Sequence, residues 1–138
     1  MAEAAVAGER VLLDASALLA VIYEETGAGE VHEALRGQAV MSAVNVGEVV
    51  ARLDEDGWTR REVAGVIDGF DLEIVPFDTA AAVLSGEFRS RTRRHAIGLG
   101  GRACVATAKQ LGIPALTADP VWKKLRLPGV RVRCIGED

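Results

Sequence analysis

The chain lacks the features that mark membrane, secreted or disulfide-rich proteins. No apolar run approaches the roughly 20 residues that a membrane helix needs, and the first residues, MAEAAVAGE, contain no basic segment typical of a secretory signal. The two cysteines, Cys104 and Cys134, lack metal-ligand spacing and are expected to be reduced core residues. With 138 residues, 49% hydrophobic and 26% charged, we expect a single cytoplasmic domain over residues 1–138 with no contact to a membrane.

Acidic residues are scarce in the second half of the chain. Residues 1–56 contain eleven Asp and Glu against three Lys and Arg, whereas residues 88–133 contain eleven Lys and Arg and one acid, Asp119. Basic side chains placed around one carboxylate would attract a polyanion. A solvated surface that complements the acidic half would show the same charges, so both interpretations stay open on charge alone.

Short apolar runs alternate with amphipathic segments, which is typical of an α/β protein with a parallel sheet. Strands are predicted at residues 10–13, 39–42, 71–77, 115–118 and 130–135. Helices are predicted at residues 15–22, 27–36, 43–53, 60–69, 78–94 and 102–111. This order predicts a three-layer α/β/α fold with a mostly parallel, about five-stranded central sheet, in which the last strand is a half-exposed edge.

Carboxylates follow three of the predicted strands. Asp14 comes directly after the first strand and Asp119 after the fourth, while Glu48 lies near the start of the helix after the second. The carboxyl ends of parallel strands open onto the crevice where such sheets bind ligands. Carboxylates that converge there need a compensating cation, and oxygen ligands suit Mg²⁺ or Mn²⁺. A metal site beside a basic surface suggests phosphodiester hydrolysis.

Ordinary structural roles compete with this interpretation. Asp14 is a good helix N-cap, and Glu48 could be an exposed residue favoured by the helix dipole. Asp78 is interpreted as an N-cap only, and Thr59 with Glu62 predicts a capping box.

The chain resembles the PIN-domain ribonucleases of bacteria, and most closely the VapC toxins of toxin–antitoxin pairs. The resemblance rests on the order and spacing of LLDASALLAVIYEE, MSAVNVGEVVARL, LEIVPFD, RRHAIGLGGRACVATAKQLGIPALTAD and VWKKL, from about Val11 to Ile135. It implies a PIN-like fold and an endoribonuclease that depends on Mg²⁺ or Mn²⁺. It also implies a homodimer and a cognate antitoxin, through which alone operator DNA would be contacted.

The resemblance also assigns roles to single residues. Asp14, Glu48 and Asp119 match three members of the family's acidic quartet, which binds the metal and carries catalysis. Beside them, three residues could orient water or these ligands: Ser16, Asn45 and Thr117. The RNA backbone would lie on a set of basic residues: Arg89, Arg91, Arg93, Arg94, Lys123 and Lys124.

The fourth acid of the quartet is missing. The family's usual LGDRAC reads LGGRAC here, so Gly101 stands in the place of a metal-ligating aspartate, and no Asp or Glu occurs from Phe88 to Ala118. We therefore expect lower metal affinity and lower turnover. The aspartate was either replaced deliberately, to silence a toxic enzyme, or lost naturally in a weakened member of the family; the sequence leaves both open.

Two other functions are considered. The chain could be a catalytically inactive PIN-like module that binds an antitoxin and takes part in autoregulation. A receiver-like signalling domain also uses carboxylates at strand ends, but its acidic pair and loop lysine cannot be placed in this sequence.

Overall fold

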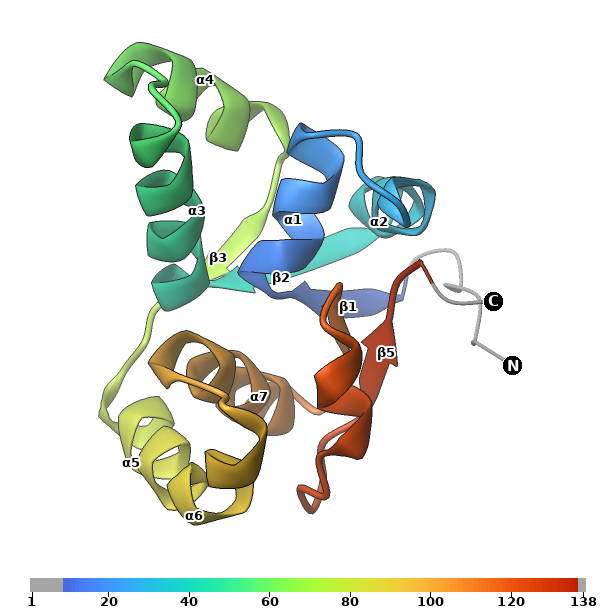
Figure 1. Ribbon diagram of the computed structural model, residues 1–138, viewed down its shortest axis with the longest axis vertical. Helices are drawn as coiled ribbons and strands as arrows, with labels where there is room; N and C mark the ends of the chain where they lie inside the picture. Colours follow the sequence, from blue (N-terminus) through green and yellow to red (C-terminus); the bar gives the residue numbers. More distant parts are fainter. Residues whose placement is uncertain (1–8, 137–138) are drawn as a thin grey trace.

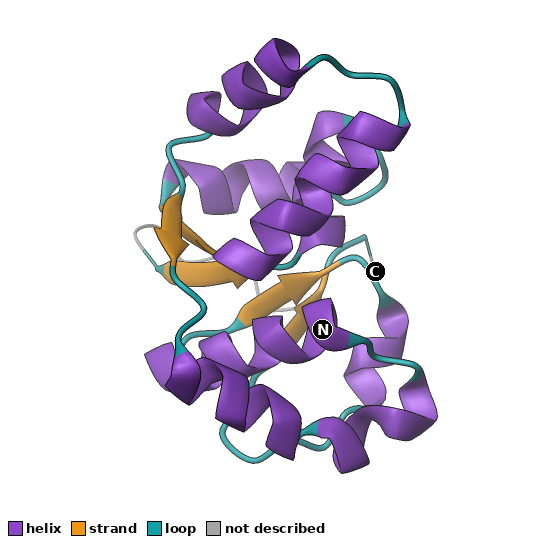
Figure 2. Cartoon of the chain, turned by 90° about the vertical axis from the view of Figure 1, so that its left-hand side faces the viewer, coloured by secondary structure: helices purple, strands orange, loops and turns teal. Residues whose placement is uncertain are grey.

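The computed structural model describes residues 9–136, which form one parallel sheet covered by helices on both faces (Figures 1 and 2). The five strands are hydrogen-bonded in the order β3-β2-β1-β4-β5. Their bounds are Arg10–Leu13 (β1), Gln38–Ser42 (β2), Glu73–Val75 (β3), Ala115–Thr117 (β4) and Val132–Cys134 (β5). The predicted three-layer α/β/α fold is confirmed, and β5 lies at an edge of the sheet as expected.

Alternating side chains of the central strands enter two separate cores. In β1, Val11 and Leu13 pack into one core and Leu12 into the other, and each of the three is at most 1% exposed. The first core is closed by four helices: α1 (Ala15–Ile22), α2 (Ala28–Arg36), α3 (Ala43–Glu55) and α4 (Arg60–Gly69). The second is closed mainly by α7 (Leu99–Leu111). A strand buried on both faces needs apolar residues throughout, which explains the continuous apolar run of β1.

Side-chain caps set several helix starts, as the sequence predicts. Thr59 and Glu62 form the capping box of α4, with the Thr59 N–H donating to Glu62 Oε1 at 2.8 Å and the Glu62 N–H donating to Thr59 Oγ1 at 3.1 Å. Asp78 caps α5 (Thr79–Glu87) by accepting from the Ala81 N–H at 2.9 Å. Local polar side chains satisfy N–H groups that have no partner inside the helix.

The prediction of one helix over residues 78–94 is wrong. The segment forms α5, then α6 (Arg89–Thr92) and a 3₁₀ turn, η1 (Arg93–His95). The Thr92 hydroxyl donates to the Phe88 carbonyl at 2.9 Å, a back-bond that competes with regular helix geometry. Ala96 then adopts a left-handed conformation (φ 54°), which ends the helical run.

Helix α7 begins three residues before its predicted start at Arg102. Gly98 is the N-cap, with an extended backbone, and Gly100 and Gly101 lie inside the first turn. Glycine has low helix propensity and therefore suggests a turn. In the structure, a Cβ atom on Gly100 would overlap the Glu48 carboxylate, and one on Gly101 would lie against Ile97 and Trp122, so packing rather than turn formation accounts for the two glycines.

Three strands are shorter than predicted: β3, β4, and β5, which spans three residues rather than six. β3 spans three residues rather than seven and lies at the edge of the sheet, where Ile74 is 46% exposed. β4 ends at Thr117, so Asp119 lies two residues beyond the strand and begins a short 3₁₀ helix, η2 (Pro120–Lys124). Across the described part of the chain, no helix combines the length and apolar character needed to cross a bilayer.

Candidate functional site

The candidate site lies where the strand order reverses. From β1 the chain builds the sheet outward through β2 to β3, whereas β4 and β5 are added on the other side of β1. β1 and β4 are parallel neighbours, with Leu13 in register with Leu116. The residues that follow these two strands therefore meet at one edge of the sheet, the position where open α/β sheets bind ligands.

Asp14 is a buried carboxylate at this edge, only 6% exposed. It caps α1, because its Oδ1 accepts from the Ala17 N–H at 2.8 Å, and the same oxygen accepts from Ser16 Oγ at 2.7 Å. Its Oδ2 accepts from Thr117 Oγ1 at 2.6 Å. Burial raises the pKa of Asp14, and the hydrogen bonds from Thr117, Ser16 and the Ala17 N–H only partly oppose this shift. A bound cation would stabilise the charged form.

Two hydroxyl groups connect Asp14 to the loop that carries Asp119. The Thr117 hydroxyl accepts from the Asp119 N–H at 3.1 Å, and the Ser16 hydroxyl accepts from the Ala118 N–H at 2.9 Å. Asp119 itself accepts from the Val121 N–H at 3.0 Å. The two loops are thereby held together by side chains that the sequence places beside the carboxylates.

Asn45 connects the remaining carboxylate to α7. Its Nδ2 donates to Glu48 Oε1 at 2.8 Å and to the carbonyl oxygen of Gly100 at 2.9 Å. Asn45 is 1% exposed, and its Oδ1 is buried without a hydrogen-bond partner among the described residues. Glu48 is exposed at the rim, in contrast to the buried Asp14.

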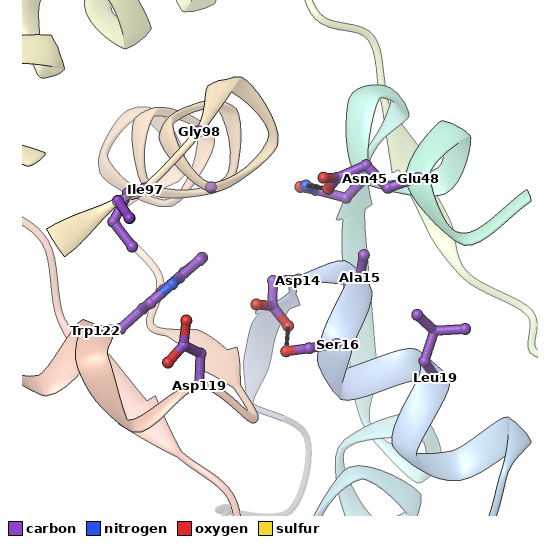
Figure 3. A pocket seen from close by; sticks show the side chains of 12 residues that line it. Asp14, Ala15, Ser16, Leu19, Asn45, Glu48, Ile97, Gly98, Asp119 and Trp122 are labelled. Atoms are coloured by element: carbon purple, nitrogen blue, oxygen red, sulfur yellow. Dashed lines mark hydrogen bonds between the residues drawn. The ribbon is translucent and has the colours of Figure 1, made fainter. Parts of the chain in front are cut away.

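A pocket of about 370 Å³ brings these side chains together (Figure 3). It is lined by six of the positions singled out in the sequence: Asp14, Ser16, Asn45, Glu48, Gly101 and Asp119. Thr117 is fully buried behind Asp14. The three carboxylates therefore open onto one cavity, from β1, α3 and the loop after β4.

The pocket also has an apolar wall that the sequence analysis misses. Ile97 and Trp122 line it opposite the carboxylate of Asp14 (Figure 3). A Cβ atom added to Gly101 would lie 2.5 Å from Cγ2 of Ile97 and 3.2 Å from Cζ2 of Trp122. The position of Trp122 three residues after Asp119 is the only sequence signal for this wall, and Ile97 has none.

The profile of the PIN domain family matches residues 11–127, most of the chain. The chain belongs to the PIN-domain family. No curated protein sequence is significantly similar to it.

Solved structures of VapBC complexes share the fold at low sequence identity. VapBC2 from Rickettsia felis, bound to a promoter DNA fragment, gives a TM-score of 0.73 at 14% identity over 91% of this chain and 98% of that one. DNA-bound VapBC from Salmonella typhimurium gives 0.70 at 20% identity over 91% and 98%. VapBC-5 from Mycobacterium tuberculosis gives 0.67 at 17% identity, with the same coverage. These likenesses establish the fold.

PIN domains are in general nucleases that use divalent metal ions, and the donor set of this PIN domain suits such an ion in part. Among the described residues, no three Asp, Glu, His or Cys side chains come close enough together to enclose a metal. The carboxylates that line the pocket nevertheless offer oxygen ligands, and a cation there would favour the charged form of Asp14, whose pKa is raised by burial. Mg²⁺ typically binds through one or two carboxylates and keeps several waters, so the residues present fit a partly hydrated ion.

The predicted RNA-binding residues lie outside the pocket of the PIN domain. All six are exposed. Arg89 and Arg91 belong to α6, Arg93 and Arg94 to η1, and Lys123 and Lys124 to η2. Because η1 packs against η2 and α6 packs against η1, the segments that carry these residues are neighbours, next to the apolar wall; the six residues together are called the basic surface.

Proposed function

We propose that this PIN domain is an endoribonuclease dependent on Mg²⁺ or Mn²⁺, the toxin of a type II toxin–antitoxin pair, with activity lowered by Gly101. The observation that carries the proposal is the opening of Asp14, Glu48 and Asp119 onto one pocket at the reversal of strand order. Carboxylate oxygens beside a basic surface suit a metal-dependent phosphodiesterase.

Asp14, Asp119 and Glu48 would hold the ion, which when bound supplies a Lewis acid for attack by water on the phosphodiester. Asp14 is held rigidly by Ser16, Thr117 and the start of α1. Its Oδ2 accepts one hydrogen bond, from Thr117, and can accept another interaction from the pocket. Glu48 and Asp119 would orient the attacking water, because each has an oxygen that accepts no hydrogen bond from the described residues.

The basic surface formed by α6, η1 and η2 would bind the RNA backbone. Its side chains are exposed and carry the charge that phosphates require. This surface lies beside the pocket rather than inside it. An RNA strand bound there could therefore place one of its phosphodiester groups in front of the carboxylates. The charge of these residues supports a polyanionic substrate.

As partners we propose a second copy of this chain in a homodimer and a cognate antitoxin protein. The neighbours in R. felis and S. typhimurium are VapBC complexes bound to DNA, which supports an antitoxin that links this chain to operator DNA. Such a pair would act in the cytoplasm.

The test is RNA cleavage in Mg²⁺, in Mn²⁺ and in EDTA, by four forms of the chain. They are the unchanged chain, Asp14→Asn, Gly101→Asp, and Gly101→Asp combined with Ile97→Ala, which clears the space that Ile97 occupies. We expect slow, metal-dependent cleavage by the unchanged chain and none by Asp14→Asn. The double variant should be at least about tenfold faster than the unchanged chain, the size of effect typical for a change in metal ligation.

A second candidate function is a catalytically inactive PIN module that binds antitoxin and takes part in autoregulation. The close approach of Ile97 to Gly101 favours it, because an apolar group fills the place of the fourth acid. If none of the four forms cleaves RNA and all still bind the antitoxin, the inactive binding module is the correct function. Full-rate cleavage by the unchanged chain would contradict the proposed impairment.

A further inference from the structure

Consecutive glycines open α7 beside the pocket, and each meets a different neighbour. A Cβ atom on Gly101 would meet the apolar side chain of Ile97, whereas a Cβ atom on Gly100 would overlap the carboxylate of Glu48. The Glu48 carboxylate therefore occupies the position that a Cβ atom of residue 100 would take. Any side chain at position 100 would occupy the volume that this carboxylate now fills.

A buried amide holds the carboxylate in this position. Asn45 Nδ2 donates to Glu48 Oε1 and to the Gly100 carbonyl oxygen, so a single amide group joins α3 to the first turn of α7. Because Asn45 is almost fully buried, it cannot exchange these partners for water without rearrangement. The carboxylate is thus fixed at the rim even though Glu48 itself is exposed.

The first turn of α7 contains no acid, and its N-cap, Gly98, provides no side-chain hydrogen bond. Negative charge is favourable at a helix N-terminus. In α7 the negative charge near the first turn is that of Glu48, which belongs to α3 and lies against Gly100. Gly101, in the same turn, provides no carboxylate.

We propose that Gly100 and Asn45 are positioning residues that hold the Glu48 carboxylate against the first turn of α7, where Gly101 provides no carboxylate. Gly100 acts by having no side chain, and Asn45 acts by its two hydrogen bonds. The proposal rests on the proposed function, in which this pocket holds a divalent ion.

The test is a double-mutant cycle on Mn²⁺ affinity, measured by titration calorimetry on the metal-free full chain. Gly100→Ala should weaken Mn²⁺ binding about tenfold, the scale seen when a group that orients a metal ligand is lost. Glu48→Gln should have a similar effect, and the double variant should bind no more weakly than either, because both changes remove one contribution. Gly86→Ala is the matched control, a helical glycine of α5 whose added Cβ meets open space.

A second readout needs no metal. The side-chain amide of Asn45 should exchange slowly with solvent in the unchanged chain and in Gly86→Ala, and faster in Gly100→Ala, where Glu48 is displaced. Thermal unfolding checks that every variant is folded, and an alanine in the first turn of α7 should not lower helix propensity.

The outcomes separate the two proposals. Additive losses of Mn²⁺ affinity in the cycle, or a Gly100→Ala variant that behaves as Gly86→Ala in both readouts, would overturn the positioning role. If no form binds Mn²⁺ while the Asn45 amide still loses protection in Gly100→Ala, the positioning role stands and the proposed metal-dependent function fails.

Discussion

Asp14 combines two roles that compete in the sequence. It is an N-cap of α1 and also a buried carboxylate facing the pocket. The two roles are compatible because they use different oxygens: Oδ1 accepts from the Ala17 N–H and from Ser16, while Oδ2 accepts only from Thr117. Capping orients the carboxylate, and burial makes its charge costly without a cation.

This burial predicts how Asp14→Asn changes stability with pH. The pKa of Asp14 is raised in the folded state, so its favourable contribution is complete below the unfolded pKa and is lost as pH rises through the folded pKa. At pH 7 the folded state bears the cost of either burying the charged carboxylate or taking up a proton, and asparagine has neither cost. We expect Asp14→Asn to raise Tm at pH 7 by about 2–4 °C, and the gain to shrink as the pH is lowered, measured by thermal unfolding from pH 7 to pH 3.

Manganese provides the matching control for this prediction. Mn²⁺ should raise the Tm of the unchanged chain and leave Asp14→Asn unaffected, because an ion that binds only the folded state stabilises it. A variant that is less stable than the unchanged chain at every pH would contradict the prediction. It would mean that the hydrogen bonds to the carboxylate outweigh its desolvation.

At the level of single elements, α7 is the helix that the pocket depends on most. Its first turn lines the pocket through Gly101, and the Gly100 carbonyl oxygen in that turn accepts a hydrogen bond from Asn45 of α3. Its later residues fill the second core. Its N-terminus has no side-chain cap, because the N-cap residue is Gly98. The helix therefore starts with N–H groups that a local side chain could satisfy.

Gly98→Ser should stabilise the protein by supplying this cap. The backbone of Gly98 is extended (φ −81°, ψ −169°), as in an ordinary serine N-cap, and an added Cβ meets open space. We expect a gain of about 0.3–0.5 kcal/mol in the free energy of unfolding, measured by chemical denaturation. Gly98→Ala has the same Cβ without the hydroxyl and should give no gain; an equal gain from both would rule out capping as the cause.

Over the whole molecule, the segments of the basic surface lie in one half. The basic surface of α6, η1 and η2 belongs to the half that also contains α5 and α7, whereas α4 lies at the opposite end (Figure 1). The sequence shows the excess of basic residues after position 88. The structure shows that η1 and η2 pack together, which brings the segments that carry these charges next to each other.

Reversing two charges of this surface should weaken RNA binding. Arg93→Glu with Arg94→Glu should lower the slope of log affinity against log salt by about 1.4, since each phosphate contact to a single strand contributes about 0.7. Fluorescence anisotropy in EDTA measures binding without cleavage. Arg60→Glu with Arg61→Glu, on exposed residues of α4, makes the same change in net charge and should have little effect; equal losses from both pairs would exclude a specific RNA surface.

The fold class could be predicted from the sequence, and so could the meeting of two carboxylates at one edge of the sheet. Continuous apolar runs identify strands buried on both faces, and Asp78, Thr59 and Glu62 mark helix starts, because these signals act over a few neighbouring residues. Asp14 and Asp119 could be placed together because parallel strands bring their carboxyl ends to one edge. Local patterns combined with the parallel topology therefore predict the positions of two of the three acids, Asp14 and Asp119.

The tertiary structure alone decided how the pocket is closed. The break at Thr92 involves a local hydrogen bond to Phe88, but the early start of α7 and the apolar wall of Ile97 and Trp122 at Gly101 are predicted by no pattern in the sequence. The Asn45 amide reaches a carbonyl 55 positions away, and Glu48 reaches the α-carbon of Gly100. Such contacts depend on how closely α3 and α7 approach each other, and this distance is set by the packing of both cores together rather than by either segment alone.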